Sequence, residues 1–182
     1  YDKLKKDGEA KGGLCMEKMV KSLHVTSEIG KLERVLLHRP GKEIEHLIPS
    51  NMERLLFDDI PFLPTMQKEH DAFAAVLQER GTQVIYLEKL VEESLLDENV
   101  KRELIEAFLK ESKNHLHKGY RILWEYLDSL DSASLVKKLM EGVLKKDIDH
   151  HQKLHLDDLL SAHYPFYIDP LPNLYFTSSS GI

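Results

Sequence analysis

The hydrophobic positions in the first half of the chain form two short runs separated by a longer amphipathic stretch. The first run, residues 35–37, is followed by a Pro-Gly turn signal, and the second run covers residues 84–87. Short apolar runs with Pro or Gly at their ends are typical of buried strands. The pattern therefore predicts two strands, one before and one after residues 65–81.

The stretch between these strands has the periodicity of a helix. We expect it to begin at Thr65, a good N-cap residue, and to end in a left-handed C-terminal cap at Gly81. Its apolar stripe is expected to contain Met66, Phe73, Ala74 and Leu77. A strand, a helix and a strand with short connections predict an α/β unit with parallel strands.

From residue 91 to about residue 160 the pattern is helical, and no strand signal interrupts it. Cap residues at Asp97 and Ser132 begin two of the predicted helices. The periodic apolar positions are Val100, Leu104, Ile105, Phe108, Leu109, Ile122, Leu123, Tyr126, Leu127, Leu135, Val136, Leu139 and Met140. The string "LHLDDLLSA" predicts one more, shorter helix. Amphipathic helices in series predict a small bundle.

The end of the chain returns to an extended pattern in "PFYIDPLPNLYFT", which prolines punctuate, and then reads "SSSGI" without a core-forming residue. We therefore expect an α/β fold with four parts. Residues 1–23 are a disordered or non-native leader, residues 24–90 an α/β module, residues 91–160 an inserted helical bundle, and residues 161–182 a return to a strand that is cut short.

The composition of the chain indicates which partners and which cellular compartment are expected. The chain has 182 residues, 42% of them hydrophobic and 31% charged, with a formal net charge of −6. A negative surface argues against nucleic acid or an anionic membrane as the main partner. No apolar run is long enough to span a membrane. The single cysteine, Cys15, allows no internal disulfide and favours a reducing compartment, so we expect a cytoplasmic protein.

The vicinal carboxylates Asp58 and Asp59 lie between apolar flanks in "LLFDDIPFLP". A carboxylate in such a loop is a good partner for a guanidinium group, through paired charge-assisted hydrogen bonds. It can equally cap a helix or tie a turn, and residue chemistry alone favours that structural interpretation.

The other candidate groups form no complete site. His151 and His155 are spaced for one helix face near Asp157, but the surrounding sequence is polar and favours a solvated connection over a metal site. His115 and His117 have weaker support. Cys15 has no histidine held beside it in the leader, so nothing would activate it as a nucleophile. We expect no metal site and no catalytic set in this chain.

Several strings together resemble the arginine deiminase family. They are "HVTSEIGKLERVLLHRPG", "LIPSNMERLLFDDIPFL", "MQKEHDAFAAVLQERGTQVIYL" and "PLPNLYFT", which have the order and spacing seen in that family. The combination of "LLFDDIP" with "PNLYFT" more than a hundred residues later is specific. The resemblance covers about residues 24–177.

The resemblance implies a pentein fold, a five-bladed α/β propeller with a helical bundle inserted in its first part. It implies cytoplasmic hydrolysis of L-arginine to citrulline and ammonia without metal or organic cofactor. A cysteine attacks the guanidinium carbon, a histidine and a carboxylate act as acid and base, and two aspartates bind the guanidinium nitrogens. Carboxylates suit this task because the arginine side chain stays positively charged at working pH.

By the same resemblance, Leu56 is the loop position whose backbone approaches the substrate, and Asn173 and Phe176 line the site, with the ring packing on the guanidinium or its alkyl stem. Asp58 and Asp59 match the same motif and are assigned to loop structure first. The family motif continues "PNLYFTRD", whereas Ser178 and Ser179 stand at the last two positions here.

We therefore expect the N-terminal part of an arginine deiminase, inactive alone because the catalytic set and the clamping aspartates belong to later parts of the family chain. The alternative is a non-catalytic module for oligomerisation or partner binding, built on the helical bundle. A dimethylarginine hydrolase or an amidinotransferase is disfavoured because those families lack the long helical insertion. L-arginine is the expected substrate of the family, and homo-oligomer formation is left open.

Overall fold

The computed structural model describes residues 29–112, 120–148 and 164–176. The chain divides into two compact units, Tyr1–Leu32 and Glu33–Ile182, and only residues 29–32 of the first are described. All the described helices and strands belong to the second unit. Within the described residues, no helix is long and apolar enough to cross a membrane.

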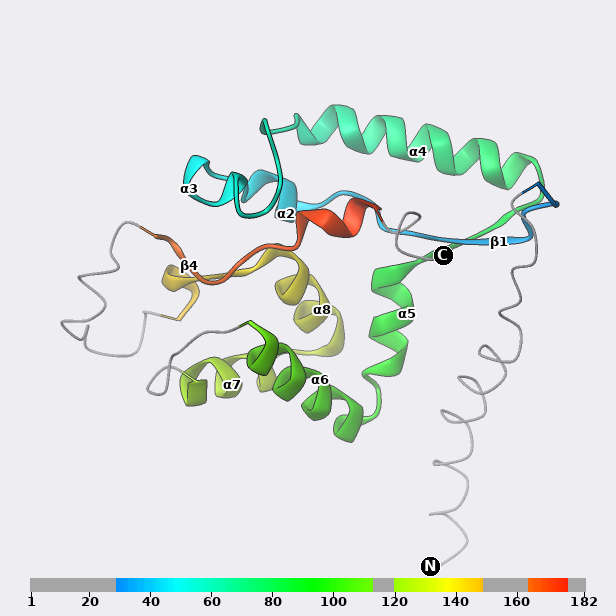
Figure 1. The fold of residues 1–182 in the computed structure, drawn as a ribbon. Coiled ribbons are helices and arrows are strands. Elements are labelled where there is room, and N and C mark those ends of the chain that lie inside the picture. Colours follow the sequence, from blue (N-terminus) through cyan, green and yellow to red (C-terminus); the bar gives the residue numbers. More distant parts are fainter. Residues whose placement is uncertain (1–28, 113–119, 149–163, 177–182) are drawn as a thin grey trace, which may run out of the picture. The chain divides into compact units, whose positions relative to one another are not determined.

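The second unit begins with the predicted α/β arrangement. Strand β1 (Arg34–Leu37) pairs in parallel with β2 (Gln83–Tyr86), and helix α4 (Leu63–Glu79) connects them and contacts β2 (Figure 1). The parallel pairing predicted from the sequence is confirmed. Two short helices, α2 (Lys42–Glu45) and α3 (Pro49–Met52), precede α4.

The two ends of α4 differ in how well the sequence predicted them. Thr65 is not the N-cap: the helix begins at Leu63 with Phe62 in the cap position, where no side chain bonds to the backbone. At the other end Gly81 has φ of 82°, as predicted. There the amides of Gly81 and Thr82 reach back to carbonyls in the last helical turn, which is the Schellman arrangement.

The buried face of α4 also differs from the predicted stripe. Ala74 is buried, but Phe73 is 54% exposed. His70, one turn before Ala74, takes the buried position that the sequence assigned to Phe73. The prediction placed Phe73 on the buried face because it is large and apolar. On a helix, however, His70 lies closer than Phe73 to the face that Leu63 and Ala74 share.

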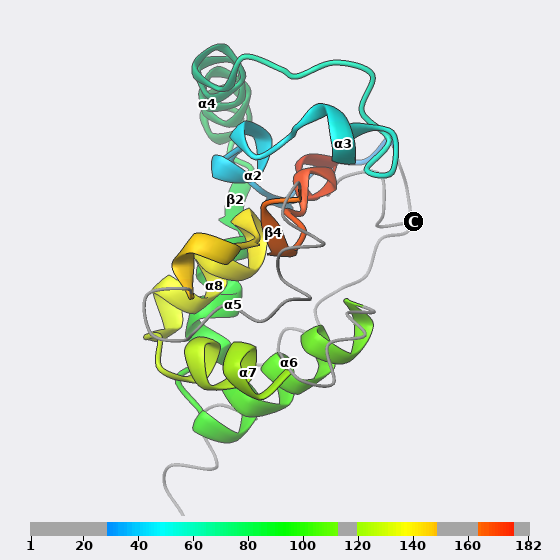
Figure 2. The same ribbon diagram turned by 90° about the vertical axis from the view of Figure 1, so that its left-hand side faces the viewer.

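Helices follow in series, as predicted. They are α5 (Leu87–Ser94), α6 (Glu98–Glu111), α7 (Tyr120–Asp128) and α8 (Ser132–Glu141). Asp97 caps α6 through a bond of 2.8 Å from the Asn99 amide, which confirms that cap. The cap of α8 is Asp131 and not Ser132, because Asp131 Oδ1 accepts the Ser134 amide at 3.0 Å. Figures 1 and 2 show α6 and α7 side by side and α5 next to α8.

A strand that the sequence did not predict follows α8. Strand β3 (Val143–Leu144) pairs antiparallel with β4 (Phe166–Ile168), so the helical stretch is interrupted before residue 165. After β4, a 3₁₀ helix, η2 (Pro172–Phe176), takes part of the segment predicted to be extended. A second 3₁₀ turn, η1, covers Lys145–Asp147.

The main hydrophobic cluster joins the helices to the second sheet. Most of its buried side chains come from α6, α7 and α8, and β3 and β4 contribute Val143 and Ile168. The four predicted core positions of α8, Leu135, Val136, Leu139 and Met140, are all buried. The mixed helix and sheet class is confirmed, and the described strands form two separate two-stranded sheets.

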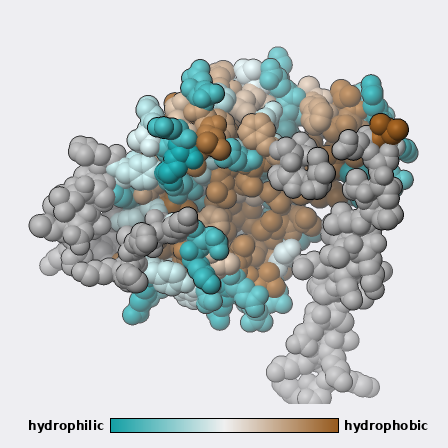
Figure 3. Space-filling model, viewed as in Figure 1, coloured by the Kyte–Doolittle hydropathy of each residue, from teal (hydrophilic) through white to brown (hydrophobic). Residues whose placement is uncertain are grey.

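Apolar surface also remains exposed on the α/β part. Figure 3 shows hydrophobic side chains gathered across the middle of one face of the molecule. Large side chains that are at least one-third exposed in the first α/β part include Leu36, Ile60, Phe62, Phe73 and Val76. Surfaces of this kind mark places where further polypeptide or a partner packs.

Candidate functional site

The turn that follows α3 holds a leucine in a conformation that leucine rarely adopts. Leu56 has φ of 63°, and no other described residue except glycine has a positive φ. The left-handed conformation costs a residue with a β-carbon roughly 1–2 kcal/mol. Leu56 is also 84% exposed, so burial of its side chain does not offset this cost. Backbone strain of this kind is concentrated at functional sites.

Backbone hydrogen bonds hold this turn in place. The amide of Leu55 bonds to the Asn51 carbonyl at 2.9 Å, that of Leu56 to the Glu53 carbonyl at 3.2 Å, and that of Phe57 to the Met52 carbonyl at 3.0 Å. The turn is therefore a continuation of α3 with defined geometry.

The side chain of Asn51 fixes the start of α3. It is fully buried, accepts the Ile48 amide at 2.9 Å and donates to the His46 carbonyl at 3.2 Å. Because a buried amide must satisfy both its donor and its acceptor, these bonds define where α3 begins and hence where the turn after it lies.

The segment η2 docks against this turn from the far end of the chain. Asn173 Nδ2 donates to the Leu55 carbonyl at 3.2 Å, across 118 residues of sequence. The rings of Phe57 and Phe176 lie 6.5 Å apart between centroids. In Figure 2, η2 is the red helix beside α2 and α3. The structure thus brings Leu56, Asn173 and Phe176 into one region.

A polar cluster links the residue before the turn to the polypeptide around β4, which precedes η2. Arg54 donates through Nη1 to Asp169 Oδ2 and through Nη2 to the hydroxyl of Tyr164 at 2.8 Å. The Tyr164 hydroxyl donates to the other Asp169 oxygen, Oδ1. The guanidinium carbon of Arg54 also lies 5.8 Å from the centre of the Tyr164 ring.

The charges of this cluster reinforce one another. The hydrogen bond that Arg54 donates to Asp169 raises the pKa of Arg54. Burial and the bond to Asp169 raise the pKa of Tyr164 to about 12. Burial alone would raise the pKa of Asp169, but its bonds from Arg54 and Tyr164 outweigh burial and lower it. The cluster is therefore an arginine cation, a carboxylate and a neutral phenol over the physiological pH range.

Asp58 and Asp59 are both exposed. Asp59 Oδ1 accepts the amide of Ile60 at 2.7 Å, a local contact within the turn. Neither carboxylate makes an ion pair with another described residue. These contacts suit the loop-structural role that the sequence favoured.

The remaining candidates lie outside the described residues. They are Cys15, His115, His117, His151, His155 and Asp157. Among the residues that the structure describes, no group of histidine, cysteine and acidic side chains is arranged to hold a metal ion.

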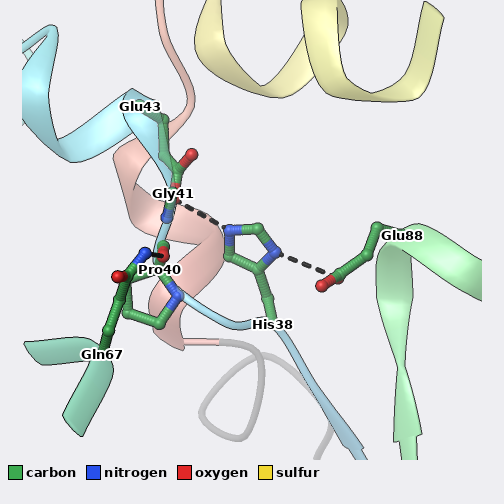
Figure 4. Close-up of polar contacts among 6 residues, drawn as sticks. All are labelled: His38, Pro40, Gly41, Glu43, Gln67 and Glu88. Atoms are coloured by element: carbon green, nitrogen blue, oxygen red, sulfur yellow. Dashed lines mark hydrogen bonds and ion pairs between the residues drawn. The ribbon is translucent and has the colours of Figure 1, made fainter. Parts of the chain in front are cut away.

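A buried histidine that the sequence reasoning missed lies directly after β1 (Figure 4). His38 is 4% exposed, and its Nε2 lies 3.0 Å from Glu43 Oε1 on α2 while its Nδ1 lies 3.3 Å from Glu88 Oε2 on α5. Burial opposes the charge on the ring, but the bonds to both carboxylates outweigh it and raise the pKa of His38 to about 9. The ring is therefore an imidazolium that donates from both nitrogens.

The same corner ties several elements together. Glu43 Oε1 also accepts the amide of Gly41, and Gln67 Nε2 on α4 donates to the Pro40 carbonyl at 2.9 Å (Figure 4). Because both ring nitrogens of His38 are occupied, the ring has no lone pair with which to act as a base. Its role here is to join β1, α2 and α5.

Comparison with known proteins identifies a family for the chain. The family model described as arginine deiminase matches residues 53–182, which include both the Leu56 turn and η2. The chain belongs to the arginine deiminase family. An arginine deiminase of Bacillus cereus (strain B4264) is 52% identical over 155 residues, and one of Listeria monocytogenes serotype 4b (strain CLIP80459) is 46% identical over 160 residues.

These arginine deiminase relatives are much longer than the chain. The matches cover 85% and 88% of the chain but only 38% and 39% of the Bacillus and Listeria proteins. The chain therefore spans about two-fifths of the length of the relatives that it matches.

Sequence reasoning missed two features of the chain. His38 had a local signal, a histidine directly after a buried strand with an acidic residue five positions later. The contact between Arg54 and Asp169 had none, because the two residues are 115 positions apart and nothing in the sequence pairs them.

Proposed function

We propose that this chain supplies one wall of the L-arginine site of an arginine deiminase, the class of enzyme that hydrolyses L-arginine to citrulline and ammonia. The hydrogen bond from Asn173 to the Leu55 carbonyl carries this proposal. It joins the turn that contains Leu56 to the segment that contains Asn173 and Phe176, and these are the three residues that the family resemblance assigns to the substrate.

The local chemistry supports this assignment. The left-handed turn at Leu56 leaves its side chain 84% exposed, where it is free to cover a ligand. The ring of Phe176 is 49% exposed and offers an apolar face to a flat guanidinium group or to the alkyl stem of arginine. An arginine side chain has both features, a planar cation and an apolar stem.

The catalytic groups have to come from other polypeptide. The only cysteine is Cys15, and the sequence has serines at positions 178 and 179 where the family motif has Arg-Asp. A serine hydroxyl cannot supply the negative charge with which an aspartate holds a guanidinium group. We infer that the chain binds and hydrolyses arginine only when the remaining part of an arginine deiminase completes the site.

We also infer the wider architecture from the family. The unit of β1, α4 and β2 would form the first module of a pentein propeller, within residues 24–90, and the helices within residues 91–160 would be the insertion. The exposed apolar side chains of the first module, such as Phe62 and Phe73, suit a surface that further propeller modules cover. A cytoplasmic location follows from the same family membership.

The test is citrulline release from L-arginine. The purified chain is assayed alone and after mixing with the part of the Bacillus cereus arginine deiminase that the chain does not match. We expect no turnover from the chain alone and recovery on mixing. Turnover by the chain alone would contradict the inference about the missing groups, and a mixture without turnover, although the two parts form a complex, would contradict the proposed site.

A further inference from the structure

The cluster of Arg54, Tyr164 and Asp169 lies next to the candidate site, and none of its three members is a proposed substrate residue. Arg54 immediately precedes Leu55, whose carbonyl accepts the bond from Asn173, and Leu56 with its positive φ follows. Any displacement of Arg54 is therefore transmitted through two peptide units to the strained turn.

The partners of Arg54 are attached to a rigid part of the molecule. Tyr164 and Asp169 flank β4, whose residues Phe166 and Ile168 are buried. Directly after Asp169, Pro170 is fully buried and the Leu171 amide bonds to the Met140 carbonyl at 2.9 Å. The carboxylate and the phenol thus have a fixed position relative to the helical core.

Stability is a poor explanation for this cluster. The side chain of Arg54 is 55% exposed and that of Asp169 is 28% exposed, and ion pairs at such positions contribute little to stability. The contacts are better explained by orientation of the Arg54 side chain. Its guanidinium group bonds to two different side chains and lies over an aromatic ring, and these contacts restrain both its position and its plane.

The strain at Leu56 explains why the turn needs such a restraint. A left-handed leucine persists only where the surrounding structure holds it. The turn has its local backbone bonds, but those move together with α3. The contacts of Arg54 tie the turn to the polypeptide around β4, and the Asn173 bond and the contact between the Phe57 and Phe176 rings tie it to η2.

We propose that Arg54, Tyr164 and Asp169 are positioning residues of the arginine site: together they hold the Leu56 turn at the correct distance and angle from Asn173 and Phe176. This inference rests on the proposed function for its link to arginine. The mechanical part, a clasp between residues 54–57 and the polypeptide around β4, stands on the geometry alone.

The first experiment tests the clasp in the full chain by amide hydrogen exchange. Arg54→Met and Asp169→Asn are expected to accelerate exchange of the Leu55, Leu56 and Phe57 amides by about tenfold, because each removes charge-assisted hydrogen bonds. Amides of α7 and α8 are expected to keep their exchange rates. The double variant R54D/D169R, which reverses the pair, is expected to restore slow exchange at 55–57.

A matched control is Arg121→Met. Arg121 makes an ion pair of 2.7 Å with Glu125 on the surface of α7, with no link to the Leu56 turn. It should leave exchange at residues 55–57 unchanged. Unchanged exchange there in R54M and D169N, or equal acceleration in α7 and α8, would overturn the clasp.

The second experiment connects the clasp to arginine. Residues 33–176 of this chain replace the matching residues in the Bacillus cereus arginine deiminase, and kinetics are measured with L-arginine. In an active graft, R54M is expected to lower kcat/KM about tenfold, mainly by raising KM, with recovery in R54D/D169R and no change in R121M.

The outcomes separate the two proposals. An inactive parent graft counts against the proposed function, and the exchange result then decides the clasp by itself. If the graft is active and its kcat/KM does not change in R54M and D169N, the proposed function is retained and the positioning role is overturned.

Discussion

The side-chain amide of Asn173 donates a hydrogen bond of 3.2 Å to the backbone carbonyl of Leu55, 118 residues earlier in the chain. The bond fastens a 3₁₀ helix near the end of the described structure to a strained turn near its beginning. Asn173 is exposed. Its contribution to stability is therefore small, and its effect on the geometry of the candidate site is the larger one.

Asn173→Asp tests this difference. Aspartate has the same shape, but its carboxylate only accepts hydrogen bonds and repels the Leu55 carbonyl. We expect the free energy of unfolding to fall by about 1 kcal/mol or less. Citrulline release by the completed enzyme should fall by about tenfold or more, because the positioning of the turn is lost.

Urea unfolding of the chain and turnover after mixing with the rest of the relative measure the two quantities. Asn99→Asp, on the exposed surface of α6, is the control and should change neither by a comparable amount. A large loss of stability with unchanged turnover would reverse the assignment of Asn173.

Leu56→Gly is expected to separate stability from function. Glycine adopts a φ of 63° without steric cost, so it relieves the strain at this position, although it also increases the entropy of the unfolded chain. The net result should be an increase of roughly 0.5–1 kcal/mol in the free energy of unfolding. Turnover in the completed enzyme should fall, since the side chain proposed to cover the substrate is gone.

Leu56→Val is the counterpart. A β-branched residue tolerates the left-handed region even less well than leucine, so this variant should be less stable than the parent chain. Thermal or urea unfolding of both variants gives the comparison. If Gly and Val change stability in the same direction, the strain at Leu56 is not what determines it.

The elements that could be predicted from the sequence are those whose pattern of apolar residues repeats within one segment or whose connections are short. Helices α6, α7 and α8 each present buried aliphatic side chains at helical spacing, and the parallel pairing of β1 with β2 follows from the short connections of an α/β unit. Strand β3 is only two residues long, too short to show any period, and its partner β4 lies beyond residue 165. Such a strand becomes visible only when the tertiary structure pairs it.

Errors at helix ends and inside the candidate site have different causes. Asp131 and Ser132 are both good caps, and a shift of one residue in the helix start decides between them. Leu56, Asn173 and Phe176 were found through family motifs and not through periodicity. The clasp of Arg54 with Asp169 joins residues 115 positions apart, and a single sequence carries no information on which distant charges meet.

The buried His38 makes stability depend on pH in the alkaline range. Its pKa is raised to about 9 in the folded chain, while an unfolded histidine titrates near its ordinary value of 6.5. Between these values the folded state binds more protons than the unfolded state, so stability falls as pH rises. The contribution is complete below about pH 6.5 and is lost as pH passes through about 9, with an upper bound of roughly 3 kcal/mol.

Urea unfolding between pH 6 and pH 10 measures this loss, and Glu88→Gln is the comparison. The variant removes one of the two carboxylates that raise the pKa of His38, so the loss of stability should be smaller and should be complete at a lower pH than in the parent chain. Lys89→Gln, which removes an exposed ion pair with Glu92 on the same helix, should leave the alkaline profile unchanged. Equal pH profiles for the parent chain and Glu88→Gln would show that Glu88 does not hold the proton on His38.

Two glycines with the same positive φ test the packing around β4. Gly81 and Gly142 both have φ of 82°, where a residue with a β-carbon is strained, so alanine is unfavourable at either position. A β-carbon at Gly81 would meet no atom within 4 Å, whereas one at Gly142 would lie 2.7 Å from the Ile168 carbonyl oxygen and 2.8 Å from the Pro170 nitrogen. Gly142→Ala should therefore lower the free energy of unfolding by clearly more than Gly81→Ala, because β4 and the chain after it have to move.

The displaced segment leads to Asp169 and Asn173, so Gly142→Ala should also accelerate amide exchange at Leu55–Phe57, and Gly81→Ala should not. Equal destabilisation by the two substitutions, measured by urea unfolding, would show that the close approach of Gly142 to β4 does not constrain the fold.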